Sequence, residues 1–184
     1  MPKTHRTAVV LIPPQDVWPP IQAIRQQHDQ HFARWMPHIT LLYPFRPREG
    51  WSALREQLEE ACHRVLPFRV KLSDLHTFRH RGSYTMWLAP EPKDALVALQ
   101  TALWRVVPDC DDTRRYRSGF TPHLSVGQAG TAEGREEVDL VVSALQNEWT
   151  PIQFKASEVH LIWRNEPPDD VFRVGHRIRL GTEG

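Results

Sequence analysis

The chain has 184 residues and a nearly balanced charge, with 23 lysine and arginine residues against 22 acidic residues. Its 40% hydrophobic and 24% charged residues are typical of a globular domain and exclude an intrinsically disordered chain. The formal net charge of +1 gives no support to a long nucleic-acid groove, because such grooves normally show an excess of basic residues. The length is sufficient for one domain with a sizeable core.

The two cysteines, Cys62 and Cys110, have neither the number nor the spacing of a disulfide framework or a zinc site. Residues 1–6 lack the apolar run of a signal peptide, and no segment has the uncharged length of a membrane-spanning helix. We therefore expect a monomer in the cytoplasm or nucleus, with no membrane contact, no metal and no cofactor.

Strand and helix signals alternate through the first half of the chain. The apolar run Thr7–Ile12, closed by two prolines, predicts a buried strand. Asp16 is a candidate cap for a helix over Val17–Ala33, and Pro37 ends that helix before a strand over His38–Phe45.

A second helix is expected from Ser52, where apolar residues recur at helical spacing up to Val65. Two extended segments follow, Phe68–Phe78 and Tyr84–Leu88, and the turn Arg81-Gly82-Ser83 joins them as a hairpin.

The same order recurs in the second half. Helices are expected over Asp94–Val107 and Thr131–Trp149, with a strand over Phe120–Gly127 between them. Ile152–Trp163 and Val171–Leu180 are extended, and the segment between them is rich in proline, asparagine and aspartate, which predicts a hairpin loop.

Two separate segments repeat at nearly the same offset. Pro37-His38-Ile39-Thr40-Leu41 matches Pro122-His123-Leu124-Ser125-Val126, and Ser73-Asp74-Leu75-His76 matches Ser157-Glu158-Val159-His160. Two matches in the same order indicate a duplicated α+β unit. Neither unit has enough elements to be stable alone, so we expect one domain over residues 1–184 with lobes of about 1–90 and 91–184. The boundary is expected near Pro90-Glu91-Pro92.

The first of these two repeated segments contains the residue types that are suited to catalysis. Side chains alternate faces along a strand, so His38 and Thr40 share one face and His123 and Ser125 share the equivalent face. The intervening apolar residues can pack under helices. Strict alternation turns Tyr43 away from His38 unless the strand bends. If the lobes pair about a pseudo-twofold axis, both histidine–hydroxyl pairs face one cleft.

This pattern is suited to phosphodiester cleavage. Histidine gives and takes protons near neutral pH, so two of them can serve as base toward the attacking oxygen and acid toward the leaving oxygen. The hydroxyls of Thr40 and Ser125, with nearby backbone N–H groups, could hold the non-bridging oxygens. The alternative is a pair of strand histidines hydrogen-bonded at a sheet surface. The duplication of the whole motif favours the catalytic interpretation.

With both His-x-Thr/Ser motifs in hand, the chain resembles the two-histidine (2H) phosphoesterase superfamily, including RNA 2′,3′-cyclic phosphodiesterases and 2′-5′ RNA ligase-like proteins. The resemblance covers nearly the whole chain. It implies a bilobal α+β fold with two antiparallel sheets flanking a positively lined cleft, helices outside, and strands that can be exchanged between lobes. It also implies metal-independent opening of cyclic phosphates at an RNA 3′ end or on a small nucleotide. Many bacterial members carry an arginine soon after the second motif, where this chain has Gly127-Gln128.

A phosphate-binding arginine must therefore come from elsewhere. Arg114 and Arg117 lead directly into the second motif and are the preferred candidates, ahead of the clusters at residues 46–48 and 79–81. Tyr43 and Phe120 flank the motifs and could stack a base. His76 and His160 are interpreted as scaffold, because a repeat also copies structural positions.

Two other functions remain open at this stage. One is 2′-5′ RNA ligation, which runs the same transesterification in reverse. The other is a non-catalytic module that binds an RNA end or a nucleotide. The intact histidines and hydroxyls weigh against the second.

Overall fold

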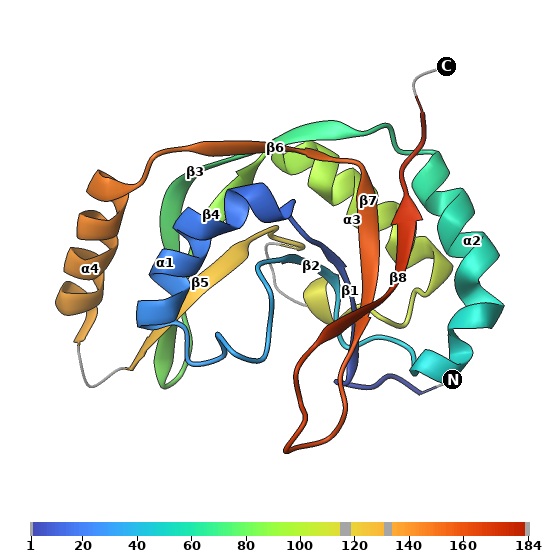
Figure 1. Ribbon diagram of the computed structural model, residues 1–184, viewed down its shortest axis with the longest axis horizontal. Coiled ribbons are helices and arrows are strands. Elements are labelled where there is room, and N and C mark those ends of the chain that lie inside the picture. Colours follow the sequence, from blue (N-terminus) through green and yellow to red (C-terminus); the bar gives the residue numbers. More distant parts are fainter. Residues whose placement is uncertain (1, 115–118, 131–133, 183–184) are drawn as a thin grey trace.

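The computed structural model describes residues 2–114, 119–130 and 134–182, and contains two four-stranded sheets (Figure 1). Every pair of neighbouring strands is antiparallel. This confirms the predicted α+β class. The first sheet has the order β2-β1-β7-β8, and its strands are β1 (Thr7–Leu11), β2 (Ile39–Leu42), β7 (Glu158–Trp163) and β8 (Arg173–Arg179). The second has the order β5-β4-β3-β6, and its strands are β3 (Phe68–Arg79), β4 (Ser83–Glu91), β5 (Leu124–Gly130) and β6 (Ile152–Ala156).

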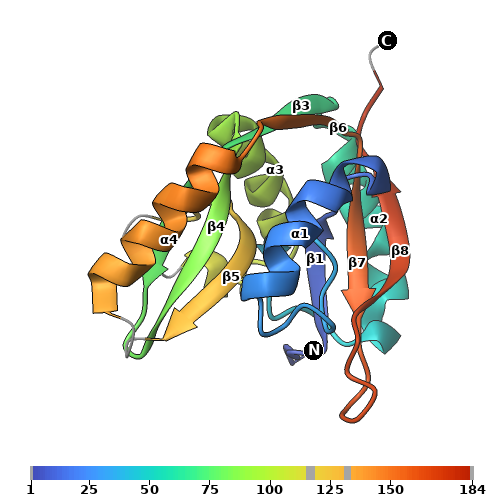
Figure 2. The same cartoon turned by 60° about the vertical axis from the view of Figure 1, so that its left-hand side comes forward.

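Four α-helices accompany the sheets: α1 (Trp18–His28), α2 (Trp51–His63), α3 (Lys93–Val106) and α4 (Gly134–Glu148). Figures 1 and 2 show α4 and α2 at opposite ends of the molecule, with α1 and α3 between them. α1 precedes β2 but packs against β5, and α3 precedes β5 but packs against β2. No helix in the described ranges is long and apolar enough to cross a bilayer.

The cross-strand neighbours of the two units correspond. Val10 pairs with Thr40 on one side and with His160 on the other, and Trp87 pairs in the same way with Ser125 and His76. β3 and β6 also pair with each other, Val70 opposite Phe154. A duplicated unit with pseudo-twofold symmetry accounts for all of these pairings.

The sheets do not follow the two halves of the sequence. β3 and β4 lie in the second sheet although they precede the expected boundary, whereas β7 joins β1 in the first. Pro90 and Glu91 form the end of β4 instead of a linker. A repeat shows which segments are equivalent, but it cannot show which sheet each strand joins, because strand partners are distant in sequence.

Several predicted elements have different bounds. α1 ends at His28 instead of Ala33, because Asp29 takes an extended conformation. The segment Ile152–Trp163 is interrupted at Ser157, and its two parts enter different sheets. The two motif strands begin after their histidines, at Ile39 and Leu124.

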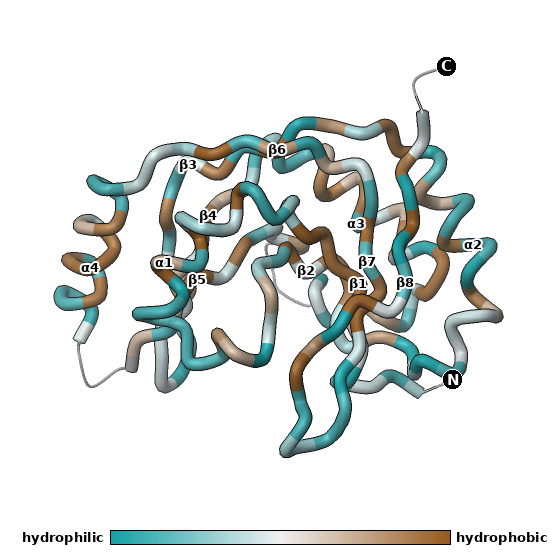
Figure 3. The backbone as a smooth tube through the Cα atoms, viewed as in Figure 1, coloured by the Kyte–Doolittle hydropathy of each residue, from teal (hydrophilic) through white to brown (hydrophobic). Residues whose placement is uncertain are grey.

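One continuous hydrophobic core includes side chains from both sheets and from α1, α2 and α3, and α4 packs against it through Val142 and Leu145. The apolar residues of the motif strands belong to this core: Ile39, Leu41, Leu124 and Val126 are fully buried. β1 is buried along its whole length, and Figure 3 shows it as a hydrophobic segment near the middle of the molecule.

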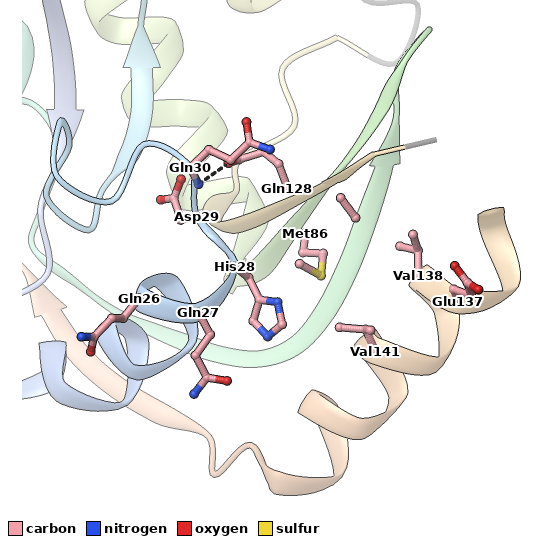
Figure 4. Close-up of a pocket in the computed structure, with 11 residues that line it drawn as sticks. Gln26, Gln27, His28, Asp29, Gln30, Met86, Gln128, Glu137, Val138 and Val141 are labelled. Carbon is pink, nitrogen blue, oxygen red and sulfur yellow. Dashed lines mark hydrogen bonds between the residues drawn. The ribbon is translucent and has the colours of Figure 1, made fainter. Parts of the chain in front are cut away.

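β5 approaches the end of α1 closely at Gly127. A Cβ atom added there would lie 2.6 Å from the Cβ of His28 and 2.9 Å from its backbone oxygen. His28 and Met86 border a cavity of about 550 Å³ between the end of α1, β4, β5 and α4 (Figure 4). Gly127 therefore allows α1 and the second sheet to pack together.

Replacing Gly127 with alanine should lower the free energy of unfolding by about 1–3 kcal/mol, because the backbone of α1 must move to admit the methyl group. Gly82→Ala is the matched control, since a Cβ at residue 82 meets nothing within 4 Å. Urea unfolding of both variants measures the difference. Equal stabilities would show that the contact between α1 and β5 is not tight.

Candidate active site

β2 and β5 are edge strands of different sheets, and they lie in contact with each other. A buried proline and then a histidine precede each strand: Pro37 and His38 precede β2, and Pro122 and His123 precede β5. The predicted alternation is present, because His38, Thr40, His123 and Ser125 are all partly exposed between buried neighbours. The two sheets thus bring the duplicated motifs to a common junction.

Each motif strand contains one extra residue relative to its partner. On β2, Thr40 pairs with Val10 but Leu42 pairs with Val9, so Leu41 is unpaired. A β-bulge of this kind reverses the alternation of faces beyond it. Tyr43, which strict alternation placed away from the site, accordingly lies beside Thr40 in the same cavity. Alternation alone cannot reveal a bulge, so the side on which Tyr43 lies depended on whether the strand bends.

The second motif has the equivalent bulge. Ser125 pairs with Trp87, but Gly127 pairs with Met86, which leaves Val126 unpaired. Gln128 then pairs with Thr85, on the face that carries Ser125. Its Oε1 accepts a hydrogen bond from the backbone N–H of Gln30 at 3.0 Å, so this side chain links β5 to the segment after α1.

Backbone carbonyls fix the tautomer of both histidines. Nδ1 of His38 lies 2.7 Å from the carbonyl oxygen of Met36, and Nδ1 of His123 lies 2.8 Å from that of Thr121. A carbonyl oxygen only accepts hydrogen bonds, so Nδ1 must be the protonated nitrogen. In each neutral ring Nε2 is left as the proton acceptor, and in each charged ring it becomes a donor.

Aromatic side chains hold both imidazoles in place. Trp35 stacks on His38, with ring centroids 4.7 Å apart. Phe78 and Trp87 meet His123 edge-on at 5.0 and 5.9 Å. These contacts restrict ring rotation on both sides of the junction.

The buried Arg25 anchors the segment that delivers His38. Its guanidinium donates to Asp29 Oδ2 and to the carbonyl oxygen of Trp35, each at 2.8 Å, and to Gln22 Oε1 at the same distance. The guanidinium is therefore fully partnered, as a buried charge requires. Because Trp35 stacks on His38, Arg25 also positions that ring indirectly.

Burial lowers the pKa of both histidines. The pKa of His38 is lowered from 6.5 to about 4. Desolvation is the largest cause, and the charges of Arg25 and His123 act in the same direction, whereas the hydrogen bond to Met36 raises the pKa. The electrostatic effect of His123 on His38 is consistent with two neighbouring rings. Desolvation also lowers the pKa of His123, and the charge of His80 adds to this. Both rings are therefore neutral at pH 7 in the free protein.

A cavity of about 570 Å³ opens at the junction. Thr40 and Tyr43 line it from the first motif, and Phe120, His123 and Ser125 line it from the second. Its volume lies within the usual range for sites that bind small molecules.

The sequence-based candidates for substrate contact divide into three groups. Tyr43 and Phe120 line the cavity, as expected. Arg114 does not: its Nη1 donates to Gln100 Oε1 at 2.9 Å and to Thr101 Oγ1 at 3.1 Å, and its guanidinium lies 4.4 Å from the ring of Trp104. α3 thus holds this side chain, which is not among the residues that line the cavity. Arg117 lies outside the described residues.

His5 and His80 also border the cavity. His5 meets Tyr43 edge-on at 5.3 Å and accepts a hydrogen bond from the Tyr43 hydroxyl through its backbone oxygen. His80 enters from the hairpin between β3 and β4. The cluster at residues 79–81 was visible in the sequence, whereas His5 carried no signal because only the folded chain brings it to Tyr43.

Comparison with known proteins agrees with this geometry. The model of the 2′-5′ RNA ligase superfamily matches residues 13–168. The chain belongs to this superfamily of 2H phosphoesterases. A protein of Geobacillus kaustophilus, provisionally named a phosphoesterase, is 26% identical over 159 residues, which cover 86% of this chain and 87% of that protein. A similarly named protein of Geobacillus thermodenitrificans is 27% identical over 179 residues, with 91% and 95% covered.

Solved structures show the same fold at low identity. TT0787 of Thermus thermophilus has a TM-score of 0.65 and 16% identity, with 97% of this chain and 100% of that chain covered. E. coli LigT complexed with phosphate has a TM-score of 0.63 and 16% identity, with 98% and 99% covered. The superfamily and the relatives together support a phosphoesterase activity.

The lowered pKa of His38 predicts acid sensitivity. Protonation of this ring favours the unfolded chain, where its pKa returns to about 6.5. The stabilising contribution is thus complete above about pH 6.5 and is lost as pH falls toward 4, to a total of about 3 kcal/mol. His38→Asn keeps an amide that can donate to Met36 but cannot titrate. Its free energy of unfolding should fall less than that of the wild type between pH 7 and pH 4.

His31→Asn, at an exposed position, is the control and should keep the wild-type dependence on pH. Urea unfolding at several pH values provides the measurement. If His38→Asn loses as much stability as the wild type over this range, His38 is not desolvated.

Proposed function

We propose that this phosphoesterase hydrolyses 2′,3′-cyclic phosphates at RNA 3′ ends or on small nucleotides, with His38 and His123 as the acid–base pair. The observation that supports this most is the matched arrangement of the two rings. Each histidine fixes Nδ1 on a carbonyl oxygen at the junction of β2 and β5, so Nε2 is the nitrogen of each ring that would transfer a proton.

The proposed reaction is a single displacement at phosphorus. A neutral imidazole takes a proton from water through Nε2 while the water oxygen forms the new bond to phosphorus. The bond from phosphorus to one ribose oxygen breaks, and the second imidazole, protonated at Nε2, gives its proton to that oxygen. The products are a ribose hydroxyl and a 2′- or 3′-phosphate monoester. Thr40 and Ser125 donate hydrogen bonds to the non-bridging oxygens as charge develops.

The different surroundings of the two rings suggest their roles. The pKa of about 4 keeps His38 neutral at physiological pH, which suits the base. His123 lines the cavity, where a bound phosphate anion favours the charged imidazolium, which suits the acid. Structures of E. coli LigT complexed with phosphate and with 3′-AMP support a nucleotide substrate for this fold.

Ligation through a 2′-5′ linkage is a second candidate, because the superfamily is named for it and an RNA 5′-hydroxyl can take the place of water in the attack on the cyclic phosphate, with the 3′-oxygen of the ribose leaving. An assay that supplies an RNA 5′-hydroxyl end together with a cyclic phosphate end detects both directions.

The substitutions His38→Asn and His123→Asn should each lower kcat/KM on a 2′,3′-cyclic nucleotide by about 10²–10⁴-fold, the usual contribution of a general acid or base. Thr40→Ala and Ser125→Ala should be less harmful. His31→Asn is the matched control and should retain full activity. The assays contain excess EDTA, because the proposed proton transfers require no metal. Near-normal turnover in either histidine variant, or loss of wild-type activity in EDTA that zinc or magnesium restores, would contradict the mechanism.

A phosphodiester with a p-nitrophenolate leaving group separates the two roles. This leaving group departs without protonation, so it compensates for a missing acid but not for a missing base. His123→Asn should therefore recover much of its lost rate on this substrate relative to a cyclic nucleotide, and His38→Asn should not. The reverse pattern would exchange the two assignments.

A further inference from the structure

We propose that the hairpin between β3 and β4 forms a second anion subsite, which binds a phosphate group adjoining the one that is cleaved. The substrate class is then a nucleotide with at least two phosphates, such as the end of an RNA chain, in preference to a nucleoside carrying only the cyclic phosphate. This inference rests on the proposed function for the identity of the first phosphate.

Three cationic or titratable side chains occupy this hairpin in succession. Arg79, His80 and Arg81 are all exposed, and none of them forms an ion pair within the described ranges of the chain. The sequence from Leu75 to Pro90 contains no acidic residue. The hairpin therefore has a positive charge that the protein itself does not neutralise, and such a surface attracts anions.

Two of these side chains face the proposed reaction site. Arg79 and His80 line the same cavity as His123 and Ser125. His80 Nε2 lies 3.1 Å from Thr85 Oγ1, across the hairpin, so its ring is oriented by a neighbouring strand. Phe78, the residue before Arg79, meets the His123 ring at 5.0 Å. The charged hairpin thus begins one residue from a direct contact with the proposed catalytic histidine.

The hairpin between β7 and β8 provides an internal comparison, because its first strand, β7, is the repeat counterpart of the C-terminal part of β3. Its acidic residues neutralise nearby arginines: Asp169 pairs with Arg173, and Asp170 pairs with Arg34 at 2.6 Å. Glu166 pairs with Arg6 at 3.3 Å. A hairpin in this position consequently does not need an excess of positive charge to fold, and the excess on residues 79–81 requires another explanation.

Within the described part of the second motif region, the cationic candidate Arg114 does not provide this charge. α3 holds Arg114, and the residue after Gly127 is a neutral glutamine whose amide bonds to Gln30. The guanidinium of Arg79 can bind two oxygens of a phosphate at once, and the imidazole of His80 can add a charge-assisted hydrogen bond. These are the groups expected in a phosphate subsite.

Calorimetric binding of two probes tests the subsite without requiring turnover. Adenosine 3′,5′-bisphosphate should bind the wild type at least about tenfold more tightly than adenosine 3′-monophosphate, as expected for charge-assisted hydrogen bonds to one further phosphate. Arg79→Gln and His80→Gln should each reduce this ratio by about threefold or more, and the double variant should bring it close to one.

Arg81→Gln is the matched control, since it removes the same charge from the same hairpin at a residue that does not line the cavity. It should keep the wild-type ratio within about twofold. A wild-type ratio near one, unchanged ratios in the Arg79 and His80 variants, or an equal loss in Arg81→Gln would overturn the proposal. A retained ratio in a protein that cleaves no cyclic phosphate would instead support the subsite and contradict the proposed function.

Discussion

β3 belongs to the first half of the chain but lies in the second sheet, whereas β7 belongs to the second half but lies in the first sheet. β3 pairs with β4 and β6, while β7 pairs with β1 and β8. Because of this exchange, neither sheet can form without strands from both halves of the chain, and the edge strands β2 and β5 are fixed in contact. The crossed packing of α1 on β5 and of α3 on β2 reinforces the same arrangement. The relative position of the two histidines therefore depends on the entire fold.

Desolvation and anchoring together explain the proposed chemistry. Burial lowers the pKa of both imidazoles and keeps them neutral, and the carbonyls of Met36 and Thr121 decide which nitrogen carries the proton. The arriving phosphate supplies the negative charge that favours protonation of one ring. In the proposed mechanism, the site holds one neutral and one charged imidazole only when an anion is bound.

The sequence was sufficient to predict the pattern of burial along the motif strands and the duplication of the unit. Alternation along the motif strands correctly separated the buried Leu41 and Val126 from the partly exposed Thr40 and Ser125, and the repeat revealed the duplication. The resemblance implied that strands can be exchanged, but the repeat could not show that β3 and β7 are the strands involved, because it contains no information on strand partners. The side on which Tyr43 lies could not be decided from alternation, because a bulge depends on register with another strand. The contacts of Arg114 with α3 could not be predicted, because proximity in sequence to His123 says nothing about the direction of a long side chain.

The central claim is that His38 and His123 act on one phosphate as a pair, and a double-mutant cycle tests it most directly. The measurement is kcat/KM on a 2′,3′-cyclic nucleotide for the wild type, His38→Asn, His123→Asn and the double variant. Residues that act as a unit show strongly non-additive losses, so the double variant should be about as slow as the slower single variant. If the two losses multiply instead, the histidines act independently and the paired mechanism is contradicted.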